Sequence, residues 1–360
     1  MGINLAAEMS HYSEPKESAS APFFSIGVTT YDRVEMLIET LNSILDQTFR
    51  DYEVIVSNDN SDRTLTGESL GIHDPRVIFI NQPKNLGEVY NMDFLLKASR
   101  GKYFTWLADD DLYAPVFLET IHKALVRNSN ASVIFTSYMA GTHFVDERRR
   151  FISPAECRLL TGSEFLNAYL SKSIMVLGCS GVFRKEYLQK IGGMENLGQG
   201  FSPYSDNWLV IKTSLLDQVG YVNSPLFFFR THEKSISFAS PDVDAYMSAQ
   251  KDLLAKSCDL LLSESLRDNF HENMFLLLVW CLRDFGSVIR RPRSISMKQV
   301  QEYIVFLKKY ATKLKGLKYY LKIWMVLMRI AIVVTLDMAK KSVHGRTAST
   351  VITTKNFFIN

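Results

Sequence analysis

Short apolar strands alternate with helical segments through the first third of the sequence, and this alternation restricts the fold more than any other feature. The pattern predicts strands at residues 23–28, 52–57, 76–80 and 103–108, with helices between and after them. Strand–helix alternation with short connections is typical of an α/β fold with a mostly parallel, Rossmann-like sheet flanked by helices. The carboxyl ends of parallel strands lie at one edge of the sheet, where such proteins bind ligands.

The loop after residues 103–108 carries three consecutive aspartates, Asp109, Asp110 and Asp111. Carboxylates repel one another, so a cluster at a strand end is unfavourable unless a cation neutralises it. Oxygen ligands of this kind suit Mg²⁺ or Mn²⁺. Taken alone, the cluster also fits a solvated acidic turn, since Asp is common in loops.

The second half of the chain is less regular and ends in helices. Residues 196–205 are rich in Gly, Ser, Asn and Pro, which predicts a mobile loop, and Asp206 then begins a strongly periodic helix. The other predicted elements are strands at 132–137, 179–183 and 221–229 and helices at 161–170, 243–263, 268–288, 297–311 and 316–340. A further helix is predicted after the strand at 179–183, ending at Gly192-Gly193.

The net charge, its distribution and the spacing of the cysteines argue against some classes of function and favour others. The net charge of +3 is too small to indicate nucleic-acid binding. Residues 301–360 hold eleven Lys or Arg and two acids, a net +9, which suggests an anionic surface as partner. The four cysteines form no C-x-x-C pair, which argues against a zinc or dithiol site and favours a reducing cytosol. Residues 1–20 have no apolar core, so we expect no secretory signal there.

Seven motifs in order resemble glycosyltransferase family 2 across about residues 23–240. The first four resemble its N-terminal, nucleotide-sugar-binding half and the last three its acceptor half. The motifs are S-I-G-V-T-T-Y-D-R, V-I-V-S-N-D-N-S-D, N-L-G-E-V-Y-N, G-K-Y-F-T-W-L-A-D-D-D, C-S-G-V-F-R-K-E-Y-L-Q-K-I-G-G-M, S-D-N-W-L-V-I-K and P-L-F-F-F-R-T-H-E-K-S-I-S. The resemblance implies the A-type glycosyltransferase fold with an all-helical C-terminal extension.

The activity implied by the resemblance is a metal-dependent, inverting transfer of a sugar from a nucleoside diphosphate sugar to a glycan or lipid-linked saccharide. The leaving diphosphate develops charge that a cation such as Mn²⁺ or Mg²⁺ would neutralise. The implied metal ligands are Asp111, Asp109 and His232. We expect Asp110 to face away, because neighbours along an extended segment point to opposite sides.

Other residues are implied contacts of the nucleotide or its phosphates. Alternatives stay open for several of them: Asp59 in an Asx-turn, Arg33 as a surface arginine, and His232 as a structural histidine. The implied contacts are Thr29, Tyr31, Arg33, Asp59, Asn85, Asp109 and Asp110, whereas Asn91 fits a structural role at least equally well.

The implied general base is Asp206, which would take the proton of the acceptor hydroxyl. The family usually has Glu-Asp at this place, whereas this chain has Ser205-Asp206. The departure removes a neighbouring negative charge and keeps the base. The competing interpretation is that Asp206 only caps its helix, a position that Asp favours.

The last predicted helix contains fourteen residues, 323–336, that are apolar except for two, which is short for a membrane span. Basic residues flank it within 313–341, a pattern that suits the surface of an anionic membrane. A buried helix or a contact with a second subunit are the alternatives. Family habit implies assembly of a bacterial surface polysaccharide (O-antigen, other lipopolysaccharide or capsule) on a polyprenyl carrier, by an enzyme peripheral to the cytoplasmic face of the plasma membrane.

These expectations divide the chain into consecutive parts and leave two rival functions. The parts are a tail at 1–21, a nucleotide-sugar half at 22–128, an acceptor half at 129–240, a helical extension at 241–345 and a tail at 346–360. One rival is a sugar nucleotidyltransferase, although Gly27 alone does not make a Gly-rich phosphate loop. The other is a non-catalytic nucleotide-sugar-binding scaffold.

Overall fold

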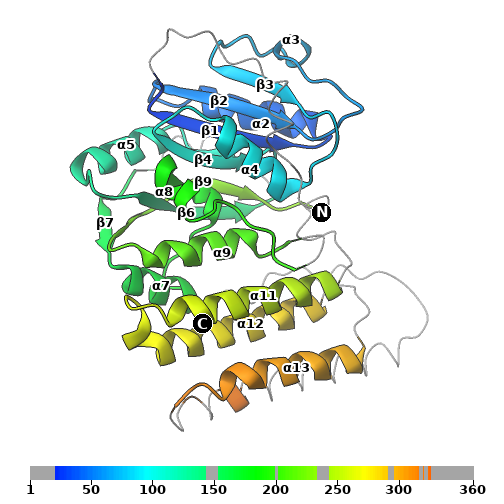
Figure 1. Cartoon of the computed structure of the whole chain (residues 1–360). Helices are drawn as coiled ribbons and strands as arrows, with labels where there is room; N and C mark the ends of the chain where they lie inside the picture. The colour runs from blue at the N-terminus through cyan, green and yellow to red at the C-terminus, as the bar shows by residue number, and fades with distance from the viewer. Residues whose placement is uncertain are drawn as a thin grey trace. The chain divides into compact units, whose positions relative to one another are not determined.

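Four parallel strands form the first half of one large sheet in the computed structural model, which describes residues 21–142, 153–198, 202–232, 243–290, 296–315, 319 and 323–325. The strands lie side by side in the order β3-β2-β1-β4 (Figure 1). Their bounds are β1 Phe24–Thr30, β2 Tyr52–Asn58, β3 Val77–Asn81 and β4 Tyr103–Ala108. All four strands predicted in this region are confirmed.

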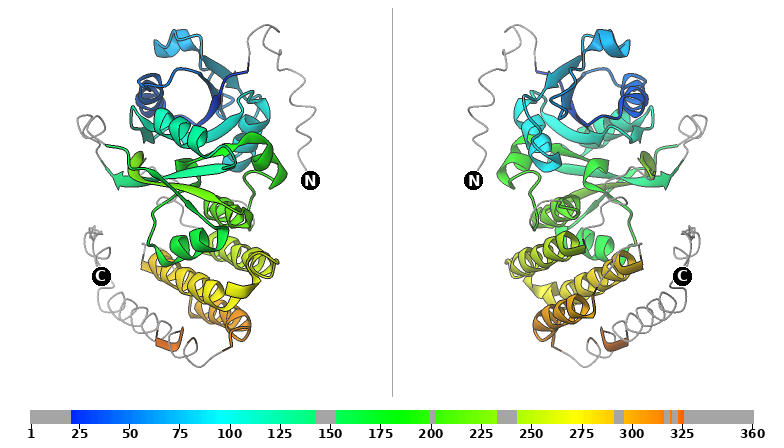
Figure 2. Two further views of the ribbon diagram at one scale, coloured as in Figure 1. Left: turned by 90° about the vertical axis from the view of Figure 1, so that its left-hand side faces the viewer. Right: turned by 90° about the vertical axis from the view of Figure 1, so that its right-hand side faces the viewer.

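Helices cover both faces of these strands. Helix α2 (Val34–Leu45) lies on one face and α4 (Glu88–Ala98) on the other, and the short α3 (Gly67–Leu70) follows β2 (Figure 2). The strand order reverses direction between β1 and β4, where Thr29 lies opposite Ala108. Such a switch point is where doubly wound sheets bind ligands.

The second half of the sheet is mixed. From β4 the sheet continues through β8 (Gly181–Arg184, antiparallel), β6 (Val133–Gly141) and β9 (Val219–Arg230), of which β6 and β9 are parallel. Two short strands that the sequence did not indicate, β5 (Leu112–Tyr113) and β7 (Cys157–Leu160), pair antiparallel with β9. The predicted α/β class with a mostly parallel sheet is therefore confirmed, with antiparallel additions.

Helical segments connect and follow the later strands. The predicted helix near 161–170 is α7, and Thr161 caps it in a capping box with Glu164. The bounds are α5 Phe117–Arg127, α7 Gly162–Ser171, the 3₁₀ turn η2 Gly178–Ser180, α8 Lys185–Lys190, α9 Ser205–Lys212, η3 Thr213–Leu215, α11 Val243–Leu261, η4 Arg267–Asn269, α12 Phe270–Arg290 and α13 Met297–Ala311. Most of the helix predicted at 316–340 lies outside the described residues.

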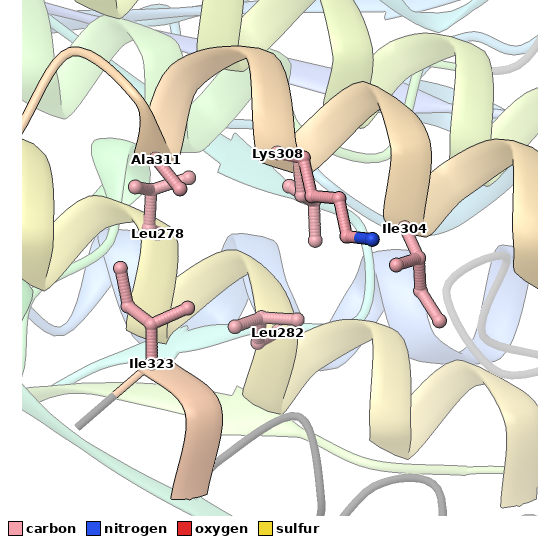
Figure 3. Close-up of a pocket in the computed structure, with 7 residues that line it drawn as sticks. Leu278, Leu282, Ile304, Lys308, Ala311 and Ile323 are labelled. Atoms are coloured by element: carbon pink, nitrogen blue, oxygen red, sulfur yellow. The ribbon is translucent and has the colours of Figure 1, made fainter. Parts of the chain in front are cut away.

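Two compact units make up the chain, residues 1–277 and 278–360. The first contains the sheet and its core. In the second, Phe285 packs on Tyr303 of α13 with ring centroids 4.1 Å apart. A small cavity beside them is lined by Leu278, Leu282, Ile304, Leu307, Lys308, Ala311 and Ile323 (Figure 3). No helix in the described part of the chain has both the length and the apolar character needed to cross a membrane.

Candidate functional site

The three aspartates lie in a tight turn between β4 and β5, at the switch point of the sheet. The turn is closed by a hydrogen bond from the Asp111 N–H to the Ala108 carbonyl at 3.2 Å. All three carboxylates are buried. Because the chain turns here instead of running extended, the alternation of neighbouring side chains does not apply.

Asp109 is held by the loop that follows β1. Thr30 Oγ1 donates to Asp109 Oδ2 at 2.6 Å, and the Arg33 guanidinium lies 2.5 Å from Oδ1. Burial raises the pKa of Asp109 to about 6, against the opposing effects of Arg33 and Thr30. Thr30 was not among the predicted residues, although its place at the end of β1 beside Thr29 could have suggested it.

Asp110 faces the same region as Asp109, so the expectation that it points away is wrong. Its Oδ2 lies 2.7 Å from Arg33 and 2.8 Å from Nε2 of His232. Arg33 therefore bridges two aspartates, and the interpretation of it as a plain surface arginine is also wrong. His232 reaches the cluster through Asp110.

Asp111 is tied to the end of β9. The backbone N–H of Arg230 donates to Asp111 Oδ1 at 2.8 Å, and Thr40 of α2 donates to its main-chain oxygen at 2.9 Å. Burial and the charge of Asp110 raise the pKa of Asp111 well above its usual value. The guanidinium of Arg230 pairs with Glu39.

The donor set of this turn fits a hard divalent cation. It combines three buried carboxylates, Asp109, Asp110 and Asp111, with the imidazole of His232, and oxygen-rich sets of this kind suit Mn²⁺ or Mg²⁺. Within the described residues no such group is already arranged as a metal site. Arg33 instead supplies positive charge to two of the carboxylates, and it would have to release them to a metal.

Asp59 shapes the loop that leads into α4. Its two carboxylate oxygens accept the N–H groups of Leu86 at 2.7 Å and Gly87 at 2.9 Å. Gly87 has φ +82°, a conformation that glycine adopts readily. The Asn85 side chain accepts from the Gly87 N–H as well, at 2.9 Å, and is otherwise exposed. Both residues thus fix this loop at the edge of the site.

Asn91 and Tyr31 lie differently around the same edge. Asn91 is buried and exchanges hydrogen bonds with Ser57 at 2.5 and 3.2 Å, so its structural role is confirmed. The Tyr31 ring is 54% exposed, and Thr29 is partly buried. The nucleotide contacts expected of Thr29, Tyr31, Asp59 and Asn85 stay predictions.

Glu88 was not predicted from the sequence. It is the first residue of α4, directly after Gly87, and solvent reaches its side chain. The surrounding protein nevertheless excludes enough water to raise the pKa of Glu88, and the charges of Arg33, Asp110 and Asp206 act on it. Glu88 therefore interacts electrostatically with both the acidic turn and Asp206. The string N-L-G-E contained the only signal, a carboxylate at a helix start.

Asp206 is the second residue of α9 and does not cap it. The capping position is Tyr204, with no side-chain cap, so the helix-cap interpretation is wrong. The Asp206 carboxylate instead lies against the backbone of Gly178, and the N–H groups of Gly178 and Cys179 act on its pKa. Burial raises its pKa, while these two N–H groups oppose the rise. Ser205 turns elsewhere and bonds the main chain of Glu195 at 2.5 Å.

Comparison with known sequences gives one family. Residues 25–192 match the model described as Glycosyl transferase family 2. An uncharacterized glycosyltransferase of Rickettsia bellii is 27% identical over 180 residues, which are 49% of this chain and 26% of the relative. One of Methanocaldococcus jannaschii is 26% identical over 180 residues, 49% of this chain and 60% of the relative. One of Haemophilus influenzae is 32% identical over 117 residues, 32% and 36% respectively. The chain thus covers less than two thirds of the length of these relatives.

Among solved structures, the chain is similar to S. aureus TarS 1–349. The crystal structure of that protein in complex with UDP-GlcNAc has a TM-score of 0.58 and 12% sequence identity, covering 92% of this chain and 94% of that chain. The structure without the ligand gives a TM-score of 0.55. At this identity the similarity concerns the fold alone, and it confirms the fold that the sequence motifs implied.

Proposed function

Because the chain belongs to glycosyltransferase family 2, an enzyme family with the A-type fold, we propose that it transfers a sugar from a nucleoside diphosphate sugar to an acceptor hydroxyl in a metal-dependent, inverting reaction. The observation that carries this proposal is an acidic turn together with a separate, partly buried carboxylate, both of which act on the charge of Glu88. The turn contains Asp109 to Asp111, and the separate carboxylate is Asp206. The charge of Glu88 interacts with those of Asp110, Asp109 and Asp206.

The acidic turn would hold the donor. A bound Mn²⁺ or Mg²⁺ would neutralise the charge that develops on the leaving diphosphate. Asp109, Asp110, Asp111 and His232 are the residues that would hold this ion. Arg33, displaced from the two carboxylates that it bridges, is long enough to pair with a phosphate instead.

Asp206 would act on the acceptor. As the acceptor oxygen attacks the anomeric carbon, its proton passes to the Asp206 carboxylate and the C–O bond to the diphosphate breaks. A single displacement from the face opposite the leaving group inverts the anomeric centre. The two backbone N–H groups on Asp206 favour its ionised form, which is the form a base needs.

We further propose the setting that the sequence implied: synthesis of a bacterial surface polysaccharide on a lipid-linked acceptor, at the cytoplasmic face of the membrane. The basic character of residues 301–360 supports this, since a carrier diphosphate and an anionic leaflet both attract cations. The similarity in fold to a protein crystallised with UDP-GlcNAc makes that nucleotide sugar the first donor to test.

A donor panel tests the function. UDP-GlcNAc, GDP-mannose and related nucleotide sugars are incubated with the protein with and without Mn²⁺, and release of nucleoside diphosphate is measured. A glycosyltransferase hydrolyses one donor slowly and only with the metal. A nucleotidyltransferase would instead form a nucleotide sugar from a nucleoside triphosphate and a sugar phosphate. A binding scaffold would shift in thermal stability with a donor and release nothing.

A further inference from the structure

The Asp206 side chain packs closely against a turn that lies 28 residues earlier in the sequence. The 3₁₀ turn η2 begins at Gly178, and the backbone N–H groups of Gly178 and Cys179 lower the pKa of Asp206. A Cβ atom built on Gly178 would lie 2.3 Å from Asp206 Oδ1 and 3.3 Å from a methyl carbon of Leu209. The first distance is far below any real contact. Gly178 is thus required by space and not by its backbone conformation, since its φ is not positive.

The turn itself is fixed from two directions. The Leu177 N–H donates to Ser180 Oγ at 3.0 Å, and Ser180 Oγ donates back to the Leu177 carbonyl at 2.8 Å. The buried Tyr113 hydroxyl lies within hydrogen-bond distance of two carbonyl oxygens, that of Cys179 at 3.2 Å and that of Trp106 at 3.1 Å. Tyr113 belongs to β5, two residues after the acidic turn. The peptide that holds Asp206 is therefore anchored to the strand that follows the acidic turn.

We propose that the N–H groups of Gly178 and Cys179 form an amide clamp that orients Asp206 toward the acceptor hydroxyl, and that Gly178 is a positioning residue for this base. The inference rests on the proposed role of Asp206 as general base. A base contributes to the rate only when its oxygen lies within hydrogen-bond reach of the proton that it removes. Donors fixed in advance hold such a carboxylate without reorganisation during the reaction.

The clamp also offsets an unfavourable electrostatic environment. Glu88, Tyr138 and Cys179 are the titratable groups whose pKa values the Asp206 charge raises. None of them supplies a positive charge to Asp206. Within the described part of the chain, the amide groups of Gly178 and Cys179 favour the ionised form of Asp206 against burial.

The test compares Gly178→Ala with a matched glycine variant. In Gly220→Ala, on β9, the new methyl group meets Ile134 Cγ1 at 2.8 Å, a similar steric conflict away from Asp206. The full-length protein is assayed for nucleotide release with Mn²⁺ and the fastest donor of the panel, beginning with UDP-GlcNAc. We expect Gly178→Ala to lower kcat by about 10- to 100-fold, the usual effect of misplacing a catalytic group by about 1 Å. The donor KM should stay within about twofold, and Gly220→Ala should keep wild-type kcat.

Two further readouts separate positioning from a structural role. The acid limb of the pH–rate profile should move to higher pH in Gly178→Ala, because loss of the amide donors raises the pKa of Asp206. In an Asp206→Asn background the same glycine change should cause no further loss of kcat, because the clamp then has no base to orient. An unshifted limb, or an equal loss in both backgrounds, would overturn the proposal.

If Gly178→Ala does not fold, a milder variant still tests whether the turn positions Asp206. Tyr113→Phe keeps the ring and removes only the hydroxyl, which contacts the carbonyls of Cys179 and Trp106. We expect a several-fold fall in kcat at constant donor KM, again absent in the Asp206→Asn background. A wild-type kcat in Tyr113→Phe would then reject the clamp. If Asp206→Asn alone retains full turnover, the base assignment fails instead, which is a distinct result.

Discussion

At the scale of single residues, Arg33 sets the net charge of the acidic turn. Its guanidinium bridges Asp109 and Asp110 and is only 21% exposed. It neutralises one charge of a cluster that carries three carboxylates, two of them with raised pKa values. A divalent cation would neutralise the cluster more completely, so binding of the ion and movement of Arg33 should occur together.

The first prediction concerns the metal. We expect Asp110→Asn and Asp111→Asn each to weaken Mn²⁺-dependent binding of UDP by at least about tenfold, because each removes one negative charge from the donor set at constant size. Isothermal titration calorimetry with UDP and Mn²⁺ measures this. Asp93→Asn, which changes a partly buried charge of α4 that pairs with Lys97, is the control and should bind normally. Wild-type affinity in Asp110→Asn would exclude that residue from the metal site.

The second prediction concerns the base. Asp206→Asn keeps the shape of the side chain but cannot take a proton, so kcat should fall by at least ~10²-fold with donor binding nearly unchanged. Because burial raises the pKa of Asp206, the wild-type rate should decline on the acid side at a higher pH than an ordinary aspartate would give. A pH–rate profile of donor hydrolysis tests both statements. Full turnover in Asp206→Asn would mean that another group takes the proton.

The third prediction concerns Glu88. Its negative charge and that of Asp206 interact, and each makes ionisation of the other less favourable. Glu88→Gln should therefore move the acid limb of kcat/KM to lower pH. Glu186→Gln, an exposed change on α8, serves as the control in the same profile. An unchanged limb would place Glu88 outside the space that Asp206 faces.

At the scale of helices and strands, the elements that could be predicted are those that leave a local pattern of apolar residues in the sequence. The parallel strands are buried on both faces, so each appears in the sequence as an apolar run. The strands β5 and β7 have two and four residues, too few for any periodicity. Contacts such as Asp206 with Gly178 depend on distant segments, and no local pattern indicates them. Asp110 was placed wrongly because the turn after β4 is not extended.

The fourth prediction tests a local signal directly. Thr161 Oγ1 accepts the Glu164 N–H at 3.2 Å, and Glu164 accepts the Thr161 N–H at 2.8 Å. Thr161→Ala should lower the free energy of unfolding by about 1 kcal/mol, measured by urea denaturation, and leave turnover unchanged. Ser171→Ala at the other end of α7 removes a hydroxyl that satisfies no N–H group, so it should cost less than ~0.5 kcal/mol. Equal stability of the two variants would argue against the capping box.

At the scale of the whole molecule, charge is distributed unevenly along the chain. Residues 301–360 carry a net +9 in a protein of net +3, so the remainder is −6. The described part of this segment includes α13, whose last turn contains Lys308 and Lys309. The segment therefore differs in charge from the residues that form the sheet and the site.

The fifth prediction concerns this segment. Deleting residues 313–360 should release the protein from anionic vesicles in a sedimentation assay, and salt should weaken binding of the intact chain. Each Lys or Arg near such a surface contributes about 1 kcal/mol. Donor hydrolysis should survive.

The deletion also removes Ile323, which lines the cavity between α12 and α13. A variant with Lys313, Lys315, Lys318 and Lys322 changed to Gln therefore serves as a matched test of charge alone, and it should also lose vesicle binding. If the intact protein stays in the supernatant with anionic vesicles, the membrane interpretation is wrong.

The position of β9 has a consequence for how the protein is made. This strand pairs with β5, β6 and β7, and its last residue, Arg230, holds Asp111. A ribosome needs roughly ten seconds to travel from the acidic turn to that residue. Throughout that time the nascent chain exposes unpaired strand edges beside an acidic turn in which Asp111 lacks the Arg230 N–H. When β9 is synthesised, it completes both the sheet and the acidic site. Translation products that end before β9 should therefore be aggregation-prone and unable to bind the donor.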